Sequence, residues 1–351
     1  MIWLYSGFIL FVVVMLALDL GVFHRKVHVV SIKEALGWSA FWISLALSFT
    51  VFIYFAYDFH WQGLGLAPDP VDGLLNSGRL AAVKYLTGYL IEESLSIDNL
   101  FIIALILGFF NVPAVQQHRV LFWGILGALV LRGVMIGVGA ALVAQFHWVL
   151  YIFGAFLVVT GIKMLVTDED EANLERNLFV RVMRRMMPVT TRFYGQRFLV
   201  RAGSPAAAAP DGGGVDPVMS TVARGALVLT PLALALVVVD LADTVFAVDS
   251  IPAIFSITAD PFLVFTSNIF AILGLRSLFF ALAGMLRAFR YLKVSLALVL
   301  ILVGVKMLAA HWLKVWLGEH SNLILLLAVV AILAGGVVAS LVAGEENAGK
   351  T

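Results

Sequence analysis

The sequence contains no cysteine, which excludes disulfide bonds, thiolate metal sites and cysteine nucleophiles. Charged residues are scarce as well, because they make up 13% of the 351 residues, whereas soluble domains carry roughly 25%. Apolar residues account for 62% of the chain, and the mean hydropathy is +1.02. This composition predicts a protein that crosses the membrane several times, with the lipid bilayer as a partner and no nucleic acid bound. The net charge of +1 identifies no protein partner.

Nine stretches are apolar over the roughly 20 residues that a helical membrane span needs. They cover about residues 3–22, 37–57, 83–109, 119–142, 147–166, 226–257, 262–284, 291–311 and 322–343. The first has no basic start and no small-residue cleavage site, so we expect a retained helix rather than a signal peptide. The expected fold class is all-α, a polytopic membrane bundle of about nine transmembrane helices.

Basic residues alternate between the two ends of these spans. They follow spans 1, 3, 5 and 7, whereas the loop after span 2 carries Asp58, Asp69 and Asp72. The positive-inside rule then places the N-terminus outside and the C-terminus in the cytoplasm, in a bacterial inner (cytoplasmic) membrane. Asp19 lies at the inner end of span 1. It either caps this span or lines a cytoplasmic entrance.

The longest connection, 167–225, is predicted to be a basic cytoplasmic loop. In its first part, Phe179, Val182 and Met186 share one helical face, as in a helix that lies on the inner leaflet. A solvated connector explains this pattern equally well. The run 202–214 is rich in alanine and glycine, which predicts a flexible linker.

Three landmarks occur twice in the same order. The pairs are Glu92/Asp98 with Asp243/Asp249 (offset 151), Leu131-Arg132 with Leu275-Arg276 (offset 144), and Gly161-Ile-Lys163-Met164 with Gly304-Val-Lys306-Met307 (offset 143). Each unit holds three spans, an odd number, so the second copy is expected to be inverted, as in many secondary transporters. The predicted parts are two spans and an outer loop (1–82), repeat 1 (83–166), the loop (167–225), inverted repeat 2 (226–311), and a last span with a cytoplasmic tail (312–351).

The acids in spans 3 and 6 are the candidate functional residues, because a carboxylate at bilayer depth costs at least ~2.5 kcal/mol. Inversion places Glu92 beside Asp249 and Asp98 beside Asp243, at two levels roughly 9 Å apart. Pro252 removes one backbone hydrogen bond and therefore predicts a helix break near Asp249.

These side chains form an all-oxygen set, which suits Mg²⁺, Ca²⁺ or Mn²⁺ better than copper or zinc. Several clustered acids cannot all stay ionised without a cation, so exchange of the metal for protons is physically reasonable. The predicted ion ligands are Glu92, Asp98, Asn99, Asp240, Asp243, Asp249 and Ser250. Asp240 has the weakest case, because Tyr89 occupies the equivalent position in the other repeat.

Arg132 and Arg276 lie inside spans 4 and 7 and need a counter-charge. Each is predicted to neutralise an acid, with a gating role as the alternative. Lys163 and Lys306 lie near helix ends, where their ammonium groups are expected to snorkel to the interface. In a purely structural alternative, these four cations neutralise the acids and no ion is bound.

The acid-bearing stretches resemble the TerC family of integral membrane proteins, in particular its Alx-like branch. The matching stretches are Leu86-Thr-Gly-Tyr-Leu-Ile-Glu92 through Ser96-Ile-Asp98-Asn99, Asp243-Thr-Val-Phe-Ala-Val-Asp249-Ser-Ile-Pro-Ala-Ile-Phe255, and Thr266-Ser-Asn-Ile-Phe-Ala-Ile-Leu-Gly-Leu-Arg276. The resemblance covers spans 1 to 9 and implies kinship with the LysE-type transporter superfamily. It also implies Mn²⁺ export, with Glu92, Asp98, Asp243 and Asp249 as coordinating acids and Asn99 and Ser250 as neutral ligands.

The sequence therefore predicts an exporter of a divalent cation, with Mn²⁺ as the expected substrate, protons as the counter-ion and no permanently bound cofactor. No enzymatic activity is expected. The family is also named for tellurium resistance and redox modulation, so a membrane protein that acts structurally or through partners is an alternative. An intramembrane aspartyl protease, with two membrane aspartates that share a proton, is a minor alternative, because no Gly-x-Gly-Asp accompanies Asp98 or Asp249.

Overall fold

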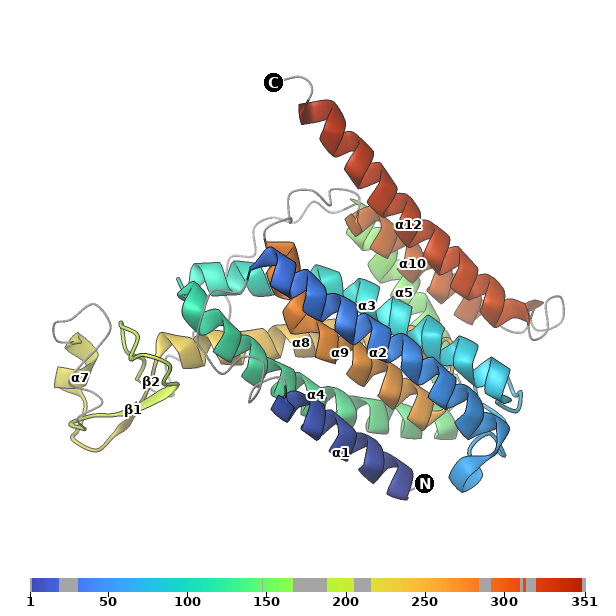
Figure 1. Cartoon of the computed structure of the whole chain (residues 1–351), viewed down its shortest axis with the longest axis horizontal. Helices are drawn as coiled ribbons and strands as arrows, with labels where there is room; N and C mark the ends of the chain where they lie inside the picture. Colours follow the sequence, from blue (N-terminus) through green and yellow to red (C-terminus); the bar gives the residue numbers. More distant parts are fainter. Residues whose placement is uncertain are drawn as a thin grey trace. The chain divides into compact units, whose positions relative to one another are not determined.

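Helices dominate the computed structural model, which describes residues 2–18, 31–146, 148–166, 188–204, 216–283, 292–309, 312–313 and 320–348 (Figure 1). The long helices are α1 (Ile2–Leu18), α2 (Ile32–Asp58), α3 (Gly78–Phe109), α4 (Ala114–Gln145), α5 (Val149–Val166), α8 (Pro231–Phe255), α9 (Pro261–Ala283), α10 (Leu292–Leu308) and α12 (His320–Ala348). The short elements are the 3₁₀ turn η2 (Trp61–Gly63), the helix α7 (Pro217–Thr221) and the strands β1 (Leu199–Arg201) and β2 (Leu227–Leu229).

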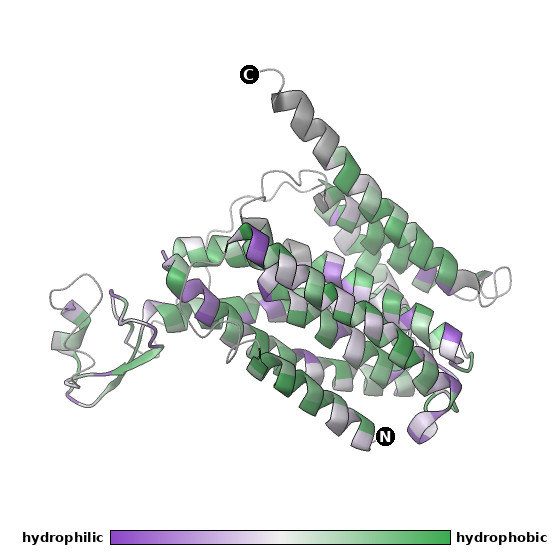
Figure 2. Ribbon diagram, viewed as in Figure 1, coloured by the Kyte–Doolittle hydropathy of each residue, from purple (hydrophilic) through white to green (hydrophobic). Residues whose placement is uncertain are grey.

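Each predicted span overlaps one of these helices. In the described part of the chain, six helices are long and apolar enough to cross a membrane, and α1 and α10 are shorter apolar helices. Hydrophobic residues cover most of α1 and α12 (Figure 2). Their outward-facing side chains include Leu10, which is 64% exposed, and Leu327, which is 60% exposed. This surface suits contact with lipid rather than water, in agreement with a mostly helical, multi-pass membrane protein.

The chain divides into two compact units. The first contains residues 1–98, 129–168 and 246–351, and the second contains residues 99–128 and 169–245. In the first unit, buried apolar side chains of α3, α5, α8, α10 and α12 form one core cluster, which includes Ile91, Leu157 and Val303. Helices α2 and α9 also pack against each other in this unit. This cluster holds α3, which carries Glu92, and a second cluster with Ile136 of α4 and Val264 of α9 holds the helices that carry Arg132 and Arg276.

Helices α5 and α10 approach each other closely at glycines. A Cβ atom on Gly161 would lie 2.8 Å from the carbonyl oxygen of Ala297 and 2.7 Å from Cγ1 of Ile301. A Cβ atom on Gly304 would lie 2.7 Å from the carbonyl oxygen of Gly154 and 2.8 Å from Cγ2 of Val158. Small residues of this kind allow membrane helices to pack backbone against backbone.

These contacts between α5 and α10 are reciprocal. Adding 143, the difference between 304 and 161, to positions 154, 158 and 161 gives 297, 301 and 304. The contact of Gly161 with Ala297 and Ile301 therefore has its counterpart in the contact of Gly304 with Gly154 and Val158. The numbers fall along α10 as they rise along α5, so the two helices are antiparallel. Contacts of this form surround a two-fold axis.

Replacing Gly161 by Val should destabilise the protein by about 1–3 kcal/mol, because the added methyl groups have no room beside Ile301. Thermal unfolding of the detergent-solubilised protein measures this loss. Gly137→Val in α4 is the matched control, since a Cβ atom there meets nothing within 4 Å. Equal losses at the two positions would contradict the close α5–α10 contact.

Two local expectations are wrong. The sixth span does not begin at residue 226, because residues 227–229 form β2 and the helix starts at Pro231. Proline at the first helical position and the Thr230 hydroxyl, which accepts a bond from the amide of Ala233, both favour a start there. Pro252 does not break α8 near Asp249 either, because the helix continues to Phe255. Pro252 lies three residues before the end of α8, so few backbone hydrogen bonds of the helix follow it.

Part of the long connection is folded. Residues 199–201, in the predicted loop, and residues 227–229, at the start of the predicted sixth span, form an antiparallel two-stranded sheet. The amphipathic pattern at 179–186, the centre of the predicted linker at 205–215, and Asp19 lie outside the described residues.

Candidate functional site

Glu92 lies in the interior of the first unit, on α3, with an exposed fraction of 0%. Its Oε1 atom forms an ion pair with Nη1 of Arg132 on α4. The Ser96 hydroxyl donates a hydrogen bond of 3.4 Å to the same oxygen. Nη1 of Arg132 also donates to Oδ1 of Asn268 on α9, at 3.4 Å. The arrangement offsets part of the cost of placing both charges at bilayer depth.

Several predicted ligands have a buried oxygen that accepts and donates no hydrogen bond among the described residues. They are Oε2 of Glu92, Oγ of Ser250 and Oδ1 of Asp240. A buried polar atom without a partner costs about 1–3 kcal/mol, and more if it is charged. Such oxygens are suited to coordinate a cation that enters from solution.

Asp240 lies against α4 within the second unit. A Cβ atom on Gly127 would lie 2.7 Å from Oδ2 of Asp240, so the glycine makes room for this carboxylate. A second glycine, Gly124, adjoins the same side chain, with its added Cβ atom 3.5 Å from Oδ1. Asp240 therefore lies against a smooth, small-residue face of the neighbouring helix.

The remaining predicted residues are placed as follows. Asn99, Asp243 and Arg276 are buried, with exposed fractions of 4%, 5% and 3%. Asp98 and Asp249 lie in α3 and α8, but their side chains are outside the described residues. Among the side chains that the structure describes, no three acids or histidines gather at a metal-binding spacing. The two-level site that combines Asp98 and Asp249 with Asp243 and Glu92 stays a prediction.

A second buried polar cluster was not predicted from the sequence. Nζ of Lys84, near the start of α3, lies 2.8 Å from Oδ2 of Asp69 and 2.8 Å from Oδ2 of Asp72, both in the α2–α3 loop. It also donates to Oδ1 of Asn76 at 2.8 Å. The Lys84 and Asp69 side chains are both 0% exposed. Lys84 is therefore the common cation of this loop.

The same cluster extends to other helices of the first unit. Asp69 accepts hydrogen bonds from the Thr258 hydroxyl and, at 3.0 Å, from the amide of Ala259, in the α8–α9 turn. Asn76 donates to Oδ2 of Asp260 at 3.3 Å. The loop is thus fixed to the turn that precedes α9. We call the set of Asp69, Asp72, Asn76, Lys84, Thr258, Asp260, Lys306 and Asn322 the α2–α3 network.

Lys306 connects this network to α10 and α12. Its Nζ atom donates to the carbonyl oxygen of Ser256 at 2.6 Å and to Oδ1 of Asn322 at 3.3 Å. Asn322 in turn donates to Oδ2 of Asp72 at 3.3 Å. The expected snorkelling of Lys306 is therefore wrong, because polar groups inside the protein hold its ammonium group. Lys163, at the end of α5, is exposed.

Two acids of the network, Asp69 and Asp260, differ in the direction of their pKa shift. Burial alone would raise the pKa of Asp69, but the Lys84 ammonium and the bonds from Thr258 and Ala259 outweigh it and lower the pKa. Burial raises the pKa of Asp260, and the charge of Asp69 adds to this effect. The sequence holds one signal for the network, since Lys84 stands inside an apolar run shortly after two aspartates.

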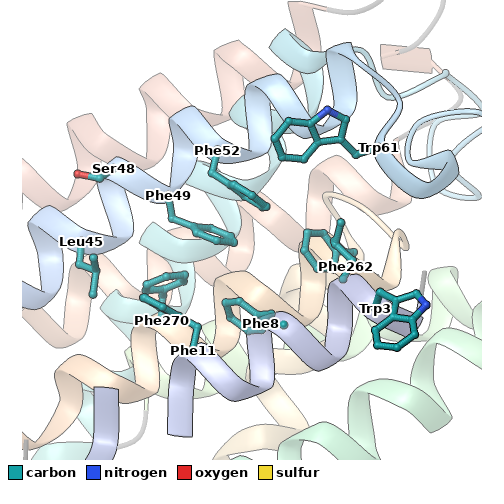
Figure 3. A pocket seen from close by; sticks show the side chains of 12 residues that line it. Trp3, Phe8, Phe11, Leu45, Ser48, Phe49, Phe52, Trp61, Phe262 and Phe270 are labelled. Carbon is teal, nitrogen blue, oxygen red and sulfur yellow. The ribbon is translucent and has the colours of Figure 1, made fainter. Parts of the chain in front are cut away.

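A pocket of about 570 Å³ lies between α1, α2 and α9 in the first unit (Figure 3). Aromatic side chains line it, among them Phe8, Phe49 and Phe270, and Ser48 supplies a hydroxyl group. Its lining contains no acid, so it has the character of a hydrocarbon-binding surface rather than an ion site.

Known proteins resemble most of the chain. Residues 77–347 match the family described as "Integral membrane protein TerC family". A membrane protein of Myxococcus xanthus is 45% identical over 339 residues, which cover 97% of this chain and 92% of that protein. Proteins named Alx, described as proposed membrane-bound redox modulators, are 42% identical in Salmonella typhi and 40% identical in Escherichia coli K12. Each of these two alignments covers 87% of this chain and 85% of the relative. No solved structure matches the chain.

Proposed function

From the premise that this chain belongs to the integral membrane protein TerC family, we propose that it exports a divalent metal cation across the bacterial inner membrane, with Mn²⁺ as the substrate. The observation that carries the proposal is the buried carboxylate of Glu92, which has Oε2 without a hydrogen-bond partner among the described residues. Asp98, Asn99, Asp240, Asp243, Asp249 and Ser250 complete the proposed ligand set. Oxygen ligands of this kind bind Mn²⁺ and Ca²⁺ readily.

The pair of Arg132 and Glu92 gives the arginine a role in this cycle. When no metal is bound, the guanidinium neutralises Glu92 and lowers the cost of the buried charge. A dication that enters the site competes with Arg132 for the same carboxylate. Protons that bind the remaining acids as the metal leaves keep the site close to neutral. Metal export and proton import are therefore coupled through one set of carboxylates.

Alternating access requires two halves that move about a fixed axis. The reciprocal contacts of α5 and α10 support this plan, because they relate the ends of the two proposed repeats by a two-fold axis and place the helices antiparallel. We propose that 83–166 and 226–311 are inverted repeats, related in the manner of LysE-type transporters, with the N-terminus outside and the C-terminus in the cytoplasm. The chain acts as a transporter and not as an enzyme.

The relatives named as redox modulators bring a second candidate, a membrane protein that acts through partners. The chain has no cysteine, so thiol chemistry of its own is not available to it. Flux of Mn²⁺ into proteoliposomes, with Ca²⁺, Mg²⁺ and tellurite as competitors, separates the two candidates. Absence of flux for all of these ions would favour the partner-based function.

Asp249→Asn should abolish protection against manganese in a strain that lacks other exporters, because it removes one charge from the proposed ligand set. Cellular manganese, measured by mass spectrometry, should rise to the level of cells with an empty vector. Asp58→Asn, at the exposed end of α2, is the control and should protect as the wild type does. Full protection by the Asp249 variant would refute the proposed site.

A further inference from the structure

The folded part of the connection between α5 and α8 is a small sheet within the second unit. Strands β1 and β2 are antiparallel, with Leu199 opposite Leu229 and Arg201 opposite Leu227. The amide of Thr190 donates to the carbonyl oxygen of Leu229 at 2.8 Å, which adds a third segment to the edge. Val200 and Val228, on the inner side, are 2% and 0% exposed. One face of the sheet is therefore buried, whereas on the other face Leu199, Arg201 and Leu227 are exposed and Leu229 is covered. We call this exposed part the open face.

Helices α4 and α8 contact this sheet near their N-terminal ends. A single residue, Thr230, separates β2 from α8, and its hydroxyl donates to the carbonyl oxygen of Arg197 at 2.7 Å. Arg119, in the second turn of α4, donates to Oε1 of Gln196 at 3.2 Å and lies over the Phe198 ring, 5.2 Å from its centroid. Figure 1 shows β1 and β2 beyond the start of α8. One residue spans at most ~3.6 Å, so β2 directly adjoins the first residue of α8, which is a candidate membrane span.

The open face combines leucine and arginine. Leu199 and Leu227 are each 48% exposed, and Arg201 stands beside Leu227 in the register of the sheet. Arg197 and Arg224 are also exposed. Residues 188–204 and 216–230 contain four arginines and one aspartate, which gives a net charge of +3. That aspartate, Asp216, is turned inward, where it accepts hydrogen bonds from the amides of Thr191, Arg192 and Val218.

We propose that the face formed by Leu199, Arg201 and Leu227, with Arg197 and Arg224, binds the headgroups of anionic phospholipids next to α4 and α8. Exposed leucines beside arginines are the composition of interfacial anchors, in which apolar side chains enter the headgroup boundary and cations attract the lipid charge. Because a single residue links the sheet to α8, the sheet stays close to the bilayer even if its own attraction to lipid is weak. This proposal requires that α8 spans the bilayer and does not depend on the transported ion.

The absence of cysteine allows a direct test in the full-length protein. Leu199→Cys carries a fluorophore in nanodiscs made of phosphatidylcholine alone or mixed with phosphatidylglycerol, each with a headgroup-labelled nitroxide lipid as quencher. We expect stronger quenching at position 199 than at the control Thr221→Cys, on the exposed surface of α7, and an increase with phosphatidylglycerol. Equal quenching at the two positions, or no response to lipid charge, overturns the proposal.

A charge-neutral variant tests the role of the arginines. Arg197→Gln, Arg201→Gln and Arg224→Gln together should reduce the quenching in anionic nanodiscs to its level in phosphatidylcholine. If this variant does not fold, high salt applied to the labelled parent chain replaces it, because salt screens an attraction between exposed charges. Quenching that depends on phosphatidylglycerol but resists both changes would contradict an electrostatic contact.

Discussion

Lys84→Met is expected to destabilise the folded protein by about 3–5 kcal/mol, because it leaves Asp69 buried without its cation. The loss should be large for a single position, since Lys84 contacts Asp69, Asp72 and Asn76 at once. Thermal unfolding in detergent, followed by the fraction of protein that stays monodisperse, measures it. Lys163→Met removes an exposed lysine from α5 and should change stability by less than ~0.5 kcal/mol.

The double variant Lys84→Met/Asp69→Asn separates loss of a charge pair from loss of packing. Removal of both charges should recover a large part of the stability, because an uncompensated carboxylate no longer remains. The amide of Ala259 can still donate to the remaining Oδ1 atom at position 69, while the Thr258 hydroxyl, which donates to Oδ2 of Asp69, can instead accept from the new Nδ2 group. If the stability loss of the double variant equals the sum of the losses of the two single variants, the Lys84–Asp69 contact carries no coupling energy.

Acid should act on the same pair. A free aspartate has a pKa of about 3.9, and the pKa of Asp69 in the folded protein is lower. The ionised Asp69 therefore contributes its full stabilisation at any pH above the free value. It is lost as the pH falls from there through the lower folded-state pKa. Stability measured over this acidic range should fall more steeply in the wild type than in the double variant. Identical slopes would remove Asp69 as a source of acid sensitivity.

Arg132→Met should have an effect of similar size, about 3–5 kcal/mol, because Glu92 then remains buried without a cation. Glu92→Gln should also destabilise the protein, since it leaves the buried guanidinium of Arg132 without its partner carboxylate. The combination Glu92→Gln/Arg132→Met should be more stable than either single variant. Unfolding in detergent, analysed as a double-mutant cycle, gives the coupling energy of the pair.

Transport separates the structural role of this pair from its role in binding. The double variant lacks the proposed ligand Glu92, so it should fold and still fail to move Mn²⁺ into proteoliposomes. A stable double variant with wild-type flux would leave Glu92 and Arg132 as a structural pair only. Ser94→Ala on the same helix, which removes a hydroxyl bonded to the Ile91 carbonyl, is a control for insertion and folding.

The sequence alone predicts the helices well, because the physical signal is local. Each span needs only a run of apolar residues, and helices α1 to α5, α8 to α10 and α12 follow those runs closely. The burial of Glu92 and Arg132 can also be predicted from the sequence, since neither charge is tolerated in lipid without a partner. The pairing of Arg132 with Glu92 cannot be predicted in this way, because helix periodicity does not specify which acid an arginine contacts.

The features that the sequence missed depend on long-range contacts. Asp69 meets Thr258 and Ala259, which are 189 and 190 positions away. Lys306 is held by Ser256 in the α8–α9 turn and by Asn322 on α12, although its place near a helix end is typical of a snorkelling lysine. Strands β1 and β2 are three residues each, too short to show an alternating pattern beside a run of alanine and glycine.

The contact of α5 with α10 has a consequence for the ancestry of the chain. Gly161 and Gly304 occupy equivalent positions in the two proposed repeats and contact corresponding partners, as identical subunits do in a homodimer. On the proposed inverted-repeat plan, a half-length ancestor would have used this face to associate with a second copy inserted the opposite way up. Fusion of two such copies then requires no new interface, only a linker that joins the end of one copy to the start of the other on the same side of the membrane. The two copies are free to diverge wherever a position does not take part in that association, and glycine at the crossing is where divergence is least tolerated.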